Sequence, residues 1–275
     1  MTVLQGIILG ALQGVAEFLP VSSSGHLAVA QRLLGITDVP LLYSIFLHLA
    51  TLLAVIIFFR TQILRLFVIL WRWITRQTPA EFDAEDGLAG SDERGRRTIA
   101  GIIAGTFITG VIGIATSRLI PELPVRYICA GFIVTAVCLI CSSRIQPRKG
   151  QGDGVSLKQA VFIGLAQGIG TLPGVSRSGS TISGALFCGV NRADAGVYSF
   201  IVSIPAVFGA FLLELKDIGE VYGSVGLVPV ISGCATAFVV GYVSLSWLMR
   251  FIKKGNLAWF ACYLIPAGIL GFLFL

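Results

Sequence analysis

The chain has 275 residues, of which 55% are hydrophobic and 12% are charged. A soluble domain does not carry so many apolar side chains, so the composition places the chain among integral membrane proteins. The formal net charge of +6 then indicates basic loops beside anionic lipid, and not a nucleic-acid partner.

The first apolar stretch, residues 3–34, is interrupted near its centre by Pro20 and the sequence SSSGH at residues 22–26. Lipid does not accept exposed irregular backbone, so this break must be buried in protein or line a wet cavity. We therefore predict a re-entrant helical hairpin over residues 3–34. Gln13 and Glu17 lie one helical turn apart just before the break, so they share a helix face.

The next apolar stretch predicts a membrane span over residues 41–59, because about 20 apolar residues cross the hydrocarbon. Residues 60–76, RTQILRLFVILWRWITR, place arginines around an apolar and aromatic face, which is typical of an interfacial helix. The charged residues 77–97 favour a mobile loop. His48 lies inside the first span, and both an approach to a site and a helix-packing hydrogen bond are open.

Two further spans are predicted at residues 99–117 and 125–143. A second broken stretch follows over residues 158–190, interrupted by PGVSRSGST at residues 173–181, and it predicts a second re-entrant hairpin. The six cysteines lie in apolar stretches and we interpret them as packing residues. The remaining expected spans are residues 196–213, 227–249 and 256–275.

The chain repeats itself at an offset of 154 residues, with seven identities in sixteen positions of the two broken stretches. The expected fold class is an all-α polytopic membrane protein built from two repeats, residues 1–150 and 151–275. Each repeat has one hairpin and three spans, and an odd number of crossings inverts the second repeat relative to the first. In such an arrangement the two hairpin tips meet near the midplane of the membrane.

The basic residues predict which side of the membrane each connection faces. Fifteen of the twenty lysines and arginines lie in connections that alternate to one side, which the positive-inside rule assigns to the cytoplasm. Both termini are then expected outside, with the first hairpin entering from outside and the second from the cytoplasm. The basic connections are residues 60–98, 144–158, 191–194 and 250–254.

The first hairpin tip combines a carboxylate, an imidazole and hydroxyls. Glu17 inside a membrane segment is costly and normally marks a site, although a structural pair with Arg177 is the alternative. His26 is one of two histidines in the chain, and a structural role is its alternative. The serines of this tip can cap the second half-helix, and a capped Gly/Ser turn is also an anion site.

The second hairpin tip presents Arg177 among small and hydroxyl-bearing residues. A guanidinium holds phosphate oxygens in a planar fork, and small neighbours let the backbone approach them. Together the two tips carry groups suited to phosphoryl transfer, with Arg177 balancing charge and acid–base groups opposite.

The motifs resemble those of a known family. The stretch QGVAEFLPVSSSGH, residues 13–26, resembles the (E/Q)xxxE and PVSSxGH signature of the undecaprenyl-diphosphatase family of the bacitracin-resistance type. The stretch LPGVSRSGSTISG, residues 172–184, is similar to the PGxSRSxxT signature of that family, and the segment YSFIVSIP at residues 198–205 extends the resemblance. It implies an enzyme that hydrolyses undecaprenyl diphosphate to the monophosphate in the cytoplasmic membrane, with the site open to the outer face.

The resemblance also implies site residues, by motif match. Expected catalytic residues are Glu17, Ser23, His26 and Arg177. Expected substrate-binding residues are Gln13, Ser22, Ser24, Gly25, Gly174, Ser176, Ser178 and Thr181.

No organic cofactor is expected, and Mg²⁺ or Ca²⁺ at Glu17 and Gln13 is the metal expectation. Many relatives have Glu in place of Gln13, which leaves here one carboxylate and one amide oxygen. The expected partners are a polyprenyl diphosphate lipid and the bilayer, with a homodimer as the expected assembly if the chain associates.

Two other functions were compared with this one. The phosphatidic-acid phosphatase superfamily shares the SGH of residues 24–26, but it requires an Arg-Pro pair that this chain lacks, and the position six after Arg177 is Ser183 and not histidine. A transporter or lipid flippase is suggested by the inverted repeat, and fold-level analogy does not decide between it and an enzyme.

Overall fold

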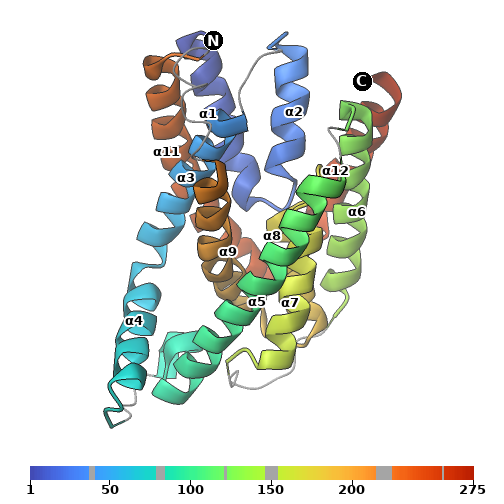
Figure 1. Cartoon of the computed structure of the whole chain (residues 1–275). Helices are drawn as coiled ribbons and strands as arrows, with labels where there is room; N and C mark the ends of the chain where they lie inside the picture. Colours follow the sequence, from blue (N-terminus) through green and yellow to red (C-terminus); the bar gives the residue numbers. More distant parts are fainter. Residues whose placement is uncertain (37–40, 79–83, 121–122, 146–153, 215–224, 256) are drawn as a thin grey trace.

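The computed structural model describes residues 1–36, 41–78, 84–120, 123–145, 154–214, 225–255 and 257–275. These residues form helices joined by short connections (Figure 1). The helices of the first half are α1 (Val3–Phe18), α2 (Ser23–Leu33), α3 (Leu41–Phe58), α4 (Arg60–Ile74), the short 3-10 helix η1 (Ala84–Ala89), α5 (Asp92–Leu119) and α6 (Val125–Ser143). Those of the second half are α7 (Leu157–Ile169), α8 (Arg177–Phe187), α9 (Arg192–Glu214), α11 (Leu227–Lys254) and α12 (Trp259–Phe274).

The helices confirm an all-α polytopic membrane protein. Among the described residues, α5, α6, α9 and α11 are each long and apolar enough to cross a bilayer. Helix α3 meets this criterion together with α4, from which it is bent by 77°. Helix α12 has 16 residues, fewer than the about 20 that a perpendicular crossing needs.

Each predicted hairpin region holds two helices. Helices α1 and α2 are separated by a short turn, and so are α7 and α8; their re-entry into the membrane stays a prediction. Ser22 caps α2 as expected, because its Oγ accepts from the Gly25 amide at 3.3 Å, and Ser176 caps α8 in the same way, accepting from the Gly179 amide at 3.1 Å.

Glycines allow the outer helix of each hairpin to lie directly on a long span. A Cβ on Gly10 of α1 would lie 2.2 Å from the Gly233 carbonyl oxygen of α11, and a Cβ on Gly164 of α7 would lie 2.7 Å from the Cα of Gly105 of α5. Small residues at such positions permit close backbone packing in membranes. Gly10 and Gly164 are equivalent in the repeat, so the two hairpins use the same device. The inverted orientation and the division into residues 1–150 and 151–275 stay predictions.

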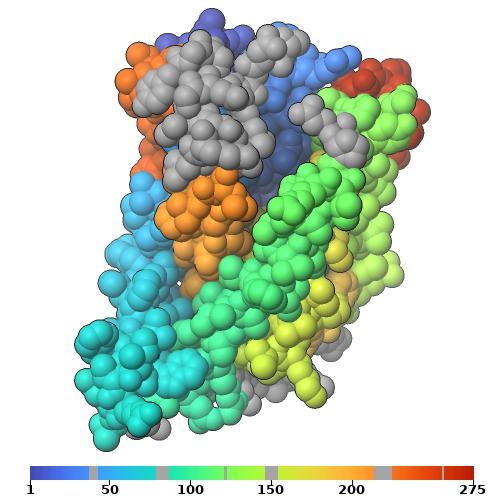
Figure 2. All heavy atoms as spheres, in the orientation of Figure 1, coloured from blue at the N-terminus to red at the C-terminus, as the bar shows by residue number. Residues whose placement is uncertain are grey.

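Helix α4 is the helix predicted as interfacial. It protrudes at the end of the molecule away from the chain termini (Figures 1 and 2). The side chains of Leu64, Phe67, Trp71 and Ile74 are exposed along it, beside the arginines of the same helix. Such a face suits the boundary between lipid and water.

The loop predicted over residues 77–97 is wrong for most of its described part. Helix η1 begins at Ala84, and α5 begins at Asp92, well before the predicted residue 99. Ser91 caps α5 by accepting from the Arg94 amide at 3.3 Å, and Asp92 and Glu93 in the first turn complement the helix dipole. The loop prediction failed here because the polar residues that cap and begin α5 have the same composition as a loop. Residues 79–83 of the predicted loop lie outside the described residues.

Candidate active site

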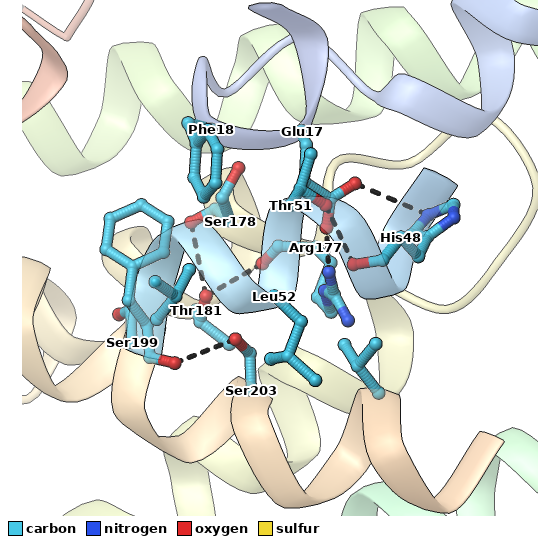
Figure 3. Close-up of a pocket in the computed structure, with 13 residues that line it drawn as sticks. Glu17, Phe18, His48, Thr51, Leu52, Arg177, Ser178, Thr181, Ser199 and Ser203 are labelled. Atoms are coloured by element: carbon cyan, nitrogen blue, oxygen red, sulfur yellow. Dashed lines mark hydrogen bonds and ion pairs between the residues drawn. The ribbon is translucent and has the colours of Figure 1, made fainter. Parts of the chain in front are cut away.

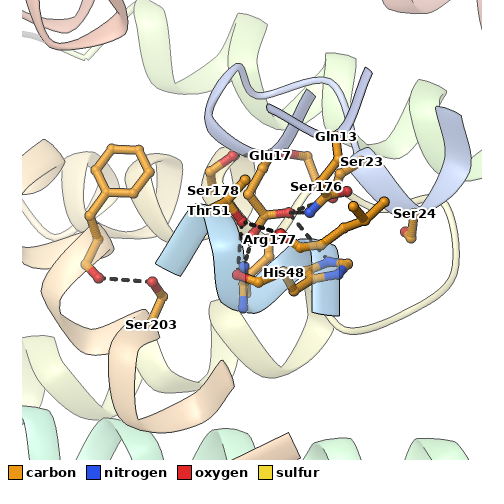
Figure 4. Close-up of polar contacts among 12 residues, drawn as sticks. Gln13, Glu17, Ser23, Ser24, His48, Thr51, Ser176, Arg177, Ser178 and Ser203 are labelled. Carbon is orange, nitrogen blue, oxygen red and sulfur yellow. Dashed lines mark hydrogen bonds and ion pairs between the residues drawn. The ribbon is translucent and has the colours of Figure 1, made fainter. Parts of the chain in front are cut away.

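The carboxylate of Glu17, at the last turn of α1, is the centre of the site. Its side chain is 7% exposed. Gln13 Nε2 donates to Glu17 Oε2 at 3.0 Å, and Ser23 Oγ donates to the same oxygen at 2.6 Å. Arg177 Nη2 donates to Glu17 Oε1 from the start of α8 (Figure 4). The two hairpin tips therefore meet through an ion pair, as the sequence predicted.

His48 also reaches Glu17, from the middle of α3. Its Nε2 lies 3.3 Å from Glu17 Oε2, and its Nδ1 lies 2.8 Å from the Ser44 carbonyl oxygen (Figure 4). The helix-packing bond and the approach to the site, which the sequence left open, therefore both occur.

Two basic side chains face the Glu17 carboxylate. Arg177 is permanently charged, and the His48 ring is the second neighbour; both are about a quarter exposed. A guanidinium beside the pocket suits an anionic ligand.

A pocket opens beside the ion pair between α1, α3, α8 and α9 (Figure 3). Its polar lining comes from Glu17, His48, Thr51, Arg177, Ser178, Thr181, Ser199 and Ser203, and its apolar lining from Phe18, Leu52, Val55, Phe200 and Val207. Phe18 packs edge-on against Phe200 with ring centroids 5.7 Å apart, which holds the end of α1 on α9. The pocket offers hydroxyls and cations on one part of its wall and an apolar surface on another.

His26 is not among the residues that line this pocket. Its Nδ1 donates to the Ser22 carbonyl oxygen at 2.8 Å, and its Nε2 lies 2.7 Å from the Tyr263 hydroxyl on α12. The ring stacks on Phe132, with centroids 4.7 Å apart, and on Tyr263, with centroids 5.6 Å apart. Because the carbonyl takes the Nδ1 proton, a neutral ring accepts from Tyr263 at Nε2. The expected catalytic role of His26 stays a prediction.

The other expected substrate-binding residues take several positions. Ser178 and Thr181 line the pocket, whereas Ser24 is exposed and its hydroxyl lies 3.4 Å from that of Ser22. Gly25 packs against the ring of Phe132, where a Cβ would lie 2.3 Å from a ring carbon.

Ser176 and Gly174 anchor the second tip to α6. The Ser176 amide donates to Thr135 Oγ1 at 2.9 Å. Gly174 has a φ of +84°, and a Cβ there would lie 1.8 Å from the Ile128 carbonyl oxygen, so the turn requires glycine. Contact of either residue with phosphate stays a prediction.

The described residues do not fit a metal ion at Gln13 and Glu17. The groups that face the Glu17 carboxylate are N–H and O–H donors and the Arg177 guanidinium, which a cation would have to displace. Within the described part of the chain, no three His, Cys, Asp or Glu side chains gather as a metal set. The buried Gln13 Oε1 has no hydrogen-bond partner there, but one amide oxygen does not make a divalent-ion site. The expectation of Mg²⁺ or Ca²⁺ stays a prediction.

Three polar residues of the pocket lining were not singled out from the sequence. Thr51 lies one turn after His48 on α3, and Ser199 and Ser203 lie one turn apart on α9. Polar residues spaced at a helical turn within an apolar span are the signal that indicates them. The segment YSFIVSIP carries both serines, but serines in spans often bond only to their own helix.

Comparisons with known proteins show the family to which the chain belongs. Residues 6–270 match the model of the family described as bacitracin resistance protein BacA. A protein of Treponema denticola named undecaprenyl-diphosphatase is 47% identical over 98% of this chain and 96% of its own length. Proteins with the same name from Desulfosudis oleivorans and Methanobrevibacter smithii are 39% and 37% identical, over 98% and 99% of this chain and 97% and 98% of their own lengths. The chain therefore belongs to the BacA family of bacitracin resistance proteins.

Proposed function

We propose that the chain is a membrane-embedded phosphatase that hydrolyses undecaprenyl diphosphate to undecaprenyl phosphate and inorganic phosphate. This reaction recycles the lipid carrier for cell-wall synthesis and thereby supports resistance to bacitracin. Relatives with the name undecaprenyl-diphosphatase cover nearly the whole chain. The observation that carries the proposal is the contact of Ser23 with Glu17, 2.6 Å apart and beside Arg177, because a hydroxyl, a base and a fixed cation suffice for phosphoryl transfer.

In the first step of this mechanism, Ser23 Oγ attacks the terminal phosphorus while Glu17 accepts the hydroxyl proton. The bond between phosphorus and the bridging oxygen breaks, and that oxygen departs with undecaprenyl phosphate. Glu17 returns its proton to the departing group. Arg177 balances the charge that develops on the phosphoryl oxygens, and His48 holds Glu17 in place.

In the second step, a water molecule attacks the phosphoserine. The bond between phosphorus and Ser23 Oγ breaks, inorganic phosphate leaves, and a proton from the water passes through Glu17 to Ser23. The pocket beside Arg177 is also lined by Ser178 and Thr181, whose hydroxyls lie on the side of the cation. His26 moves no proton in these two steps, and its expected acid–base role stays a prediction.

The proposed location is the cytoplasmic membrane, which is the inner membrane in a cell that has two membranes. The site is proposed to open to the outer face of this membrane. The basis is the charge distribution of the sequence, in which fifteen of twenty lysines and arginines fall on one side. The polyprenyl diphosphate and the bilayer are the proposed partners. A homodimer stays a prediction.

A flippase is the rival function, because inverted repeats are common in transporters. Phosphate release by purified protein in detergent separates the two, since a flippase leaves the diphosphate intact. We expect wild-type protein to release one phosphate per lipid diphosphate, and no release would overturn the enzymatic proposal.

The nucleophile is tested by acid quenching during turnover. We expect mass spectrometry to find phosphate on Ser23, and Ser23→Ala to lose activity while remaining folded. Turnover by Ser23→Ala at the wild-type rate would assign the attack to water or to His26.

A further inference from the structure

Ser199 is a buried hydroxyl in the lining of the pocket. It lies on α9, is 2% exposed, and is drawn among the lining residues in Figure 3. Its Oγ has no hydrogen-bond partner among the described residues. A buried polar group without a partner destabilises the folded protein, so a fold that retains one beside a cationic pocket requires a reason.

The neighbouring hydroxyls of the pocket are engaged. Thr51 donates to the His48 carbonyl at 2.9 Å, Thr181 to the Arg177 carbonyl at 2.8 Å, and Ser203 to the Phe200 carbonyl at 2.8 Å. Ser178 lies 3.2 Å from the Ser176 hydroxyl. Ser199 is therefore the hydroxyl of this described lining that has no hydrogen-bond partner.

The pocket selects the kind of ligand. Arg177 lines it, and the His48 ring lies on the side of α3. A free O–H donor in the same pocket lining as a cation matches an oxyanion with several acceptor atoms, because charge-assisted hydrogen bonds to phosphate are strong. A neutral apolar ligand would leave the Ser199 hydroxyl without a partner.

We propose that Ser199 is a substrate-binding residue that donates its hydroxyl proton to a phosphoryl oxygen of the diphosphate held by Arg177. This inference rests on the proposed function, because it takes the diphosphate as the anion. Ser199 and Arg177 then bind the anion from α9 and α8, so that α9 also contributes to recognition. Loss of one hydrogen bond to a charged ligand reduces affinity on the order of tenfold to a hundredfold.

Tyr198 supplies a matched control. It neighbours Ser199 on α9, is fully buried, and its hydroxyl also has no hydrogen-bond partner in the described part of the chain. Tyr198 does not line the pocket. It packs near Gly101 of α5, where a Cβ would lie 3.0 Å from its hydroxyl. Tyr198→Phe and Ser199→Ala therefore each remove one unpartnered hydroxyl, and only the second removes it from the pocket.

The experiment measures kcat/KM, inhibition by inorganic diphosphate and Tm for wild type, Ser199→Ala, Ser199→Thr and Tyr198→Phe. We expect both hydroxyl deletions to leave Tm unchanged or raised. We expect Ser199→Ala to lower kcat/KM and weaken inhibition by inorganic diphosphate in the same proportion, tenfold or more. Ser199→Thr keeps the hydroxyl and should retain most of the affinity, and Tyr198→Phe should match wild type.

Three results would overturn the inference: wild-type inhibition of Ser199→Ala by diphosphate, a loss of activity in proportion to lost Tm with unchanged inhibition, or equal losses in the alanine and threonine variants. Binding of inorganic diphosphate is also measured by titration without turnover. If wild type binds diphosphate but releases no phosphate from the lipid, the proposed function fails, and the titration of Ser199→Ala still tests the anion contact.

Discussion

Arg177 contacts Glu17 across 160 positions of sequence, and its two possible roles give different forecasts. If it holds the diphosphate through a planar fork, lysine keeps the charge but loses the fork, so Arg177→Lys should be severely impaired. Arg177→Ala should lower the rate on the order of 10²–10³-fold, as for other preorganised charge stabilisers. Phosphate release by purified variants of equal Tm measures both.

The double variant Arg177→Ala with Glu17→Gln separates binding from structural pairing. If the guanidinium only neutralises Glu17, the double variant should recover the Tm that Arg177→Ala loses and should bind inorganic diphosphate as wild type does. Activity does not decide this question, because glutamine cannot act as the base that the mechanism assigns to Glu17. Recovery of Tm and of diphosphate binding would remove Arg177 from the substrate-binding residues, whereas a stable double variant that does not bind diphosphate would keep it there.

His48 is expected to support Glu17 through charge. His48→Asn retains a polar side chain but removes the imidazole ring whose Nε2 lies 3.3 Å from Glu17. We expect kcat/KM to fall roughly tenfold, the value of one hydrogen bond to a charged group, with the folded fraction unchanged. The control is Ser143→Ala, which removes a hydroxyl that donates to the Ile140 carbonyl on α6. This change should have no effect on kcat/KM. Full activity of His48→Asn would make His48 a packing residue of α3.

His26 is tested by keeping its stacking and removing its chemistry. His26→Phe preserves an aromatic ring between Phe132 and Tyr263 but lacks both nitrogens. If His26 acts as an acid or base, this variant should lose about 10²–10⁴-fold in rate. More than about a tenth of wild-type activity in folded His26→Phe would contradict a catalytic role and leave stacking as the function of the ring.

At the scale of helices, the surroundings of two glycines, one on α1 and one on α5, predict opposite effects of alanine on the free energy of unfolding. Gly10→Ala places a Cβ 2.2 Å from the Gly233 carbonyl oxygen and should destabilise the protein by roughly 1–3 kcal/mol through overpacking. Gly110→Ala on α5 meets no atom within 4 Å and should stabilise it by roughly 0.5–1 kcal/mol. Thermal unfolding in detergent compares them, and equal Tm values would mean that α1 is not packed closely on α11.

Helix positions followed well from apolar length, but helix ends did not. Helix α6 occupies residues 125–143 as predicted, because Pro124 and Arg144 bound its apolar run. Helix α11 continues to Lys254 past the predicted residue 249, because lysines suit a helix C-terminus and Gly255 closes it with a φ of +80°. A hydropathy criterion stops at the edge of lipid, whereas hydrogen bonding and capping carry a helix into water.

The candidate site was predictable where the motifs carried it. Ser23 and Arg177 both contact Glu17. This was expected, because ionisable groups inside membrane segments are costly and normally pair. The approach of His48 and Ser199 depends on the packing of α3 and α9 against the hairpins, which no local pattern encodes. The orientation of His26 toward Tyr263 was missed for the same reason, since α12 lies more than two hundred positions away.

At the scale of the whole molecule, the structure supports one part of the predicted topology. The basic connections gather at one end: a Cβ on Gly87 would lie 2.8 Å from Asp194, and one on Gly255 would lie 2.9 Å from Arg192, which itself donates to the Ile145 carbonyl at 3.3 Å. Both chain termini lie at the other end (Figure 1). The assignment of the basic end to the cytoplasm stays a prediction.

Cysteine labelling tests that assignment. In a background without the six native cysteines, a cysteine at residue 90 should be protected from an impermeant thiol reagent in intact cells. A cysteine at residue 220, which lies outside the described residues, should react. The two variants control for each other, and labelling of residue 90 would reverse the orientation.

The ion pair between Glu17 and Arg177 has a consequence for biosynthesis. A growing chain inserts the first hairpin, with its carboxylate, long before the ribosome has made the guanidinium that neutralises it. The tip of α1 must therefore wait in a hydrated or provisional state, since an unpaired charge in the bilayer is costly, and it closes when α8 arrives. Truncated nascent chains should then expose residue 17 to water until the second hairpin has left the ribosome, so that the site assembles only in the second half of synthesis.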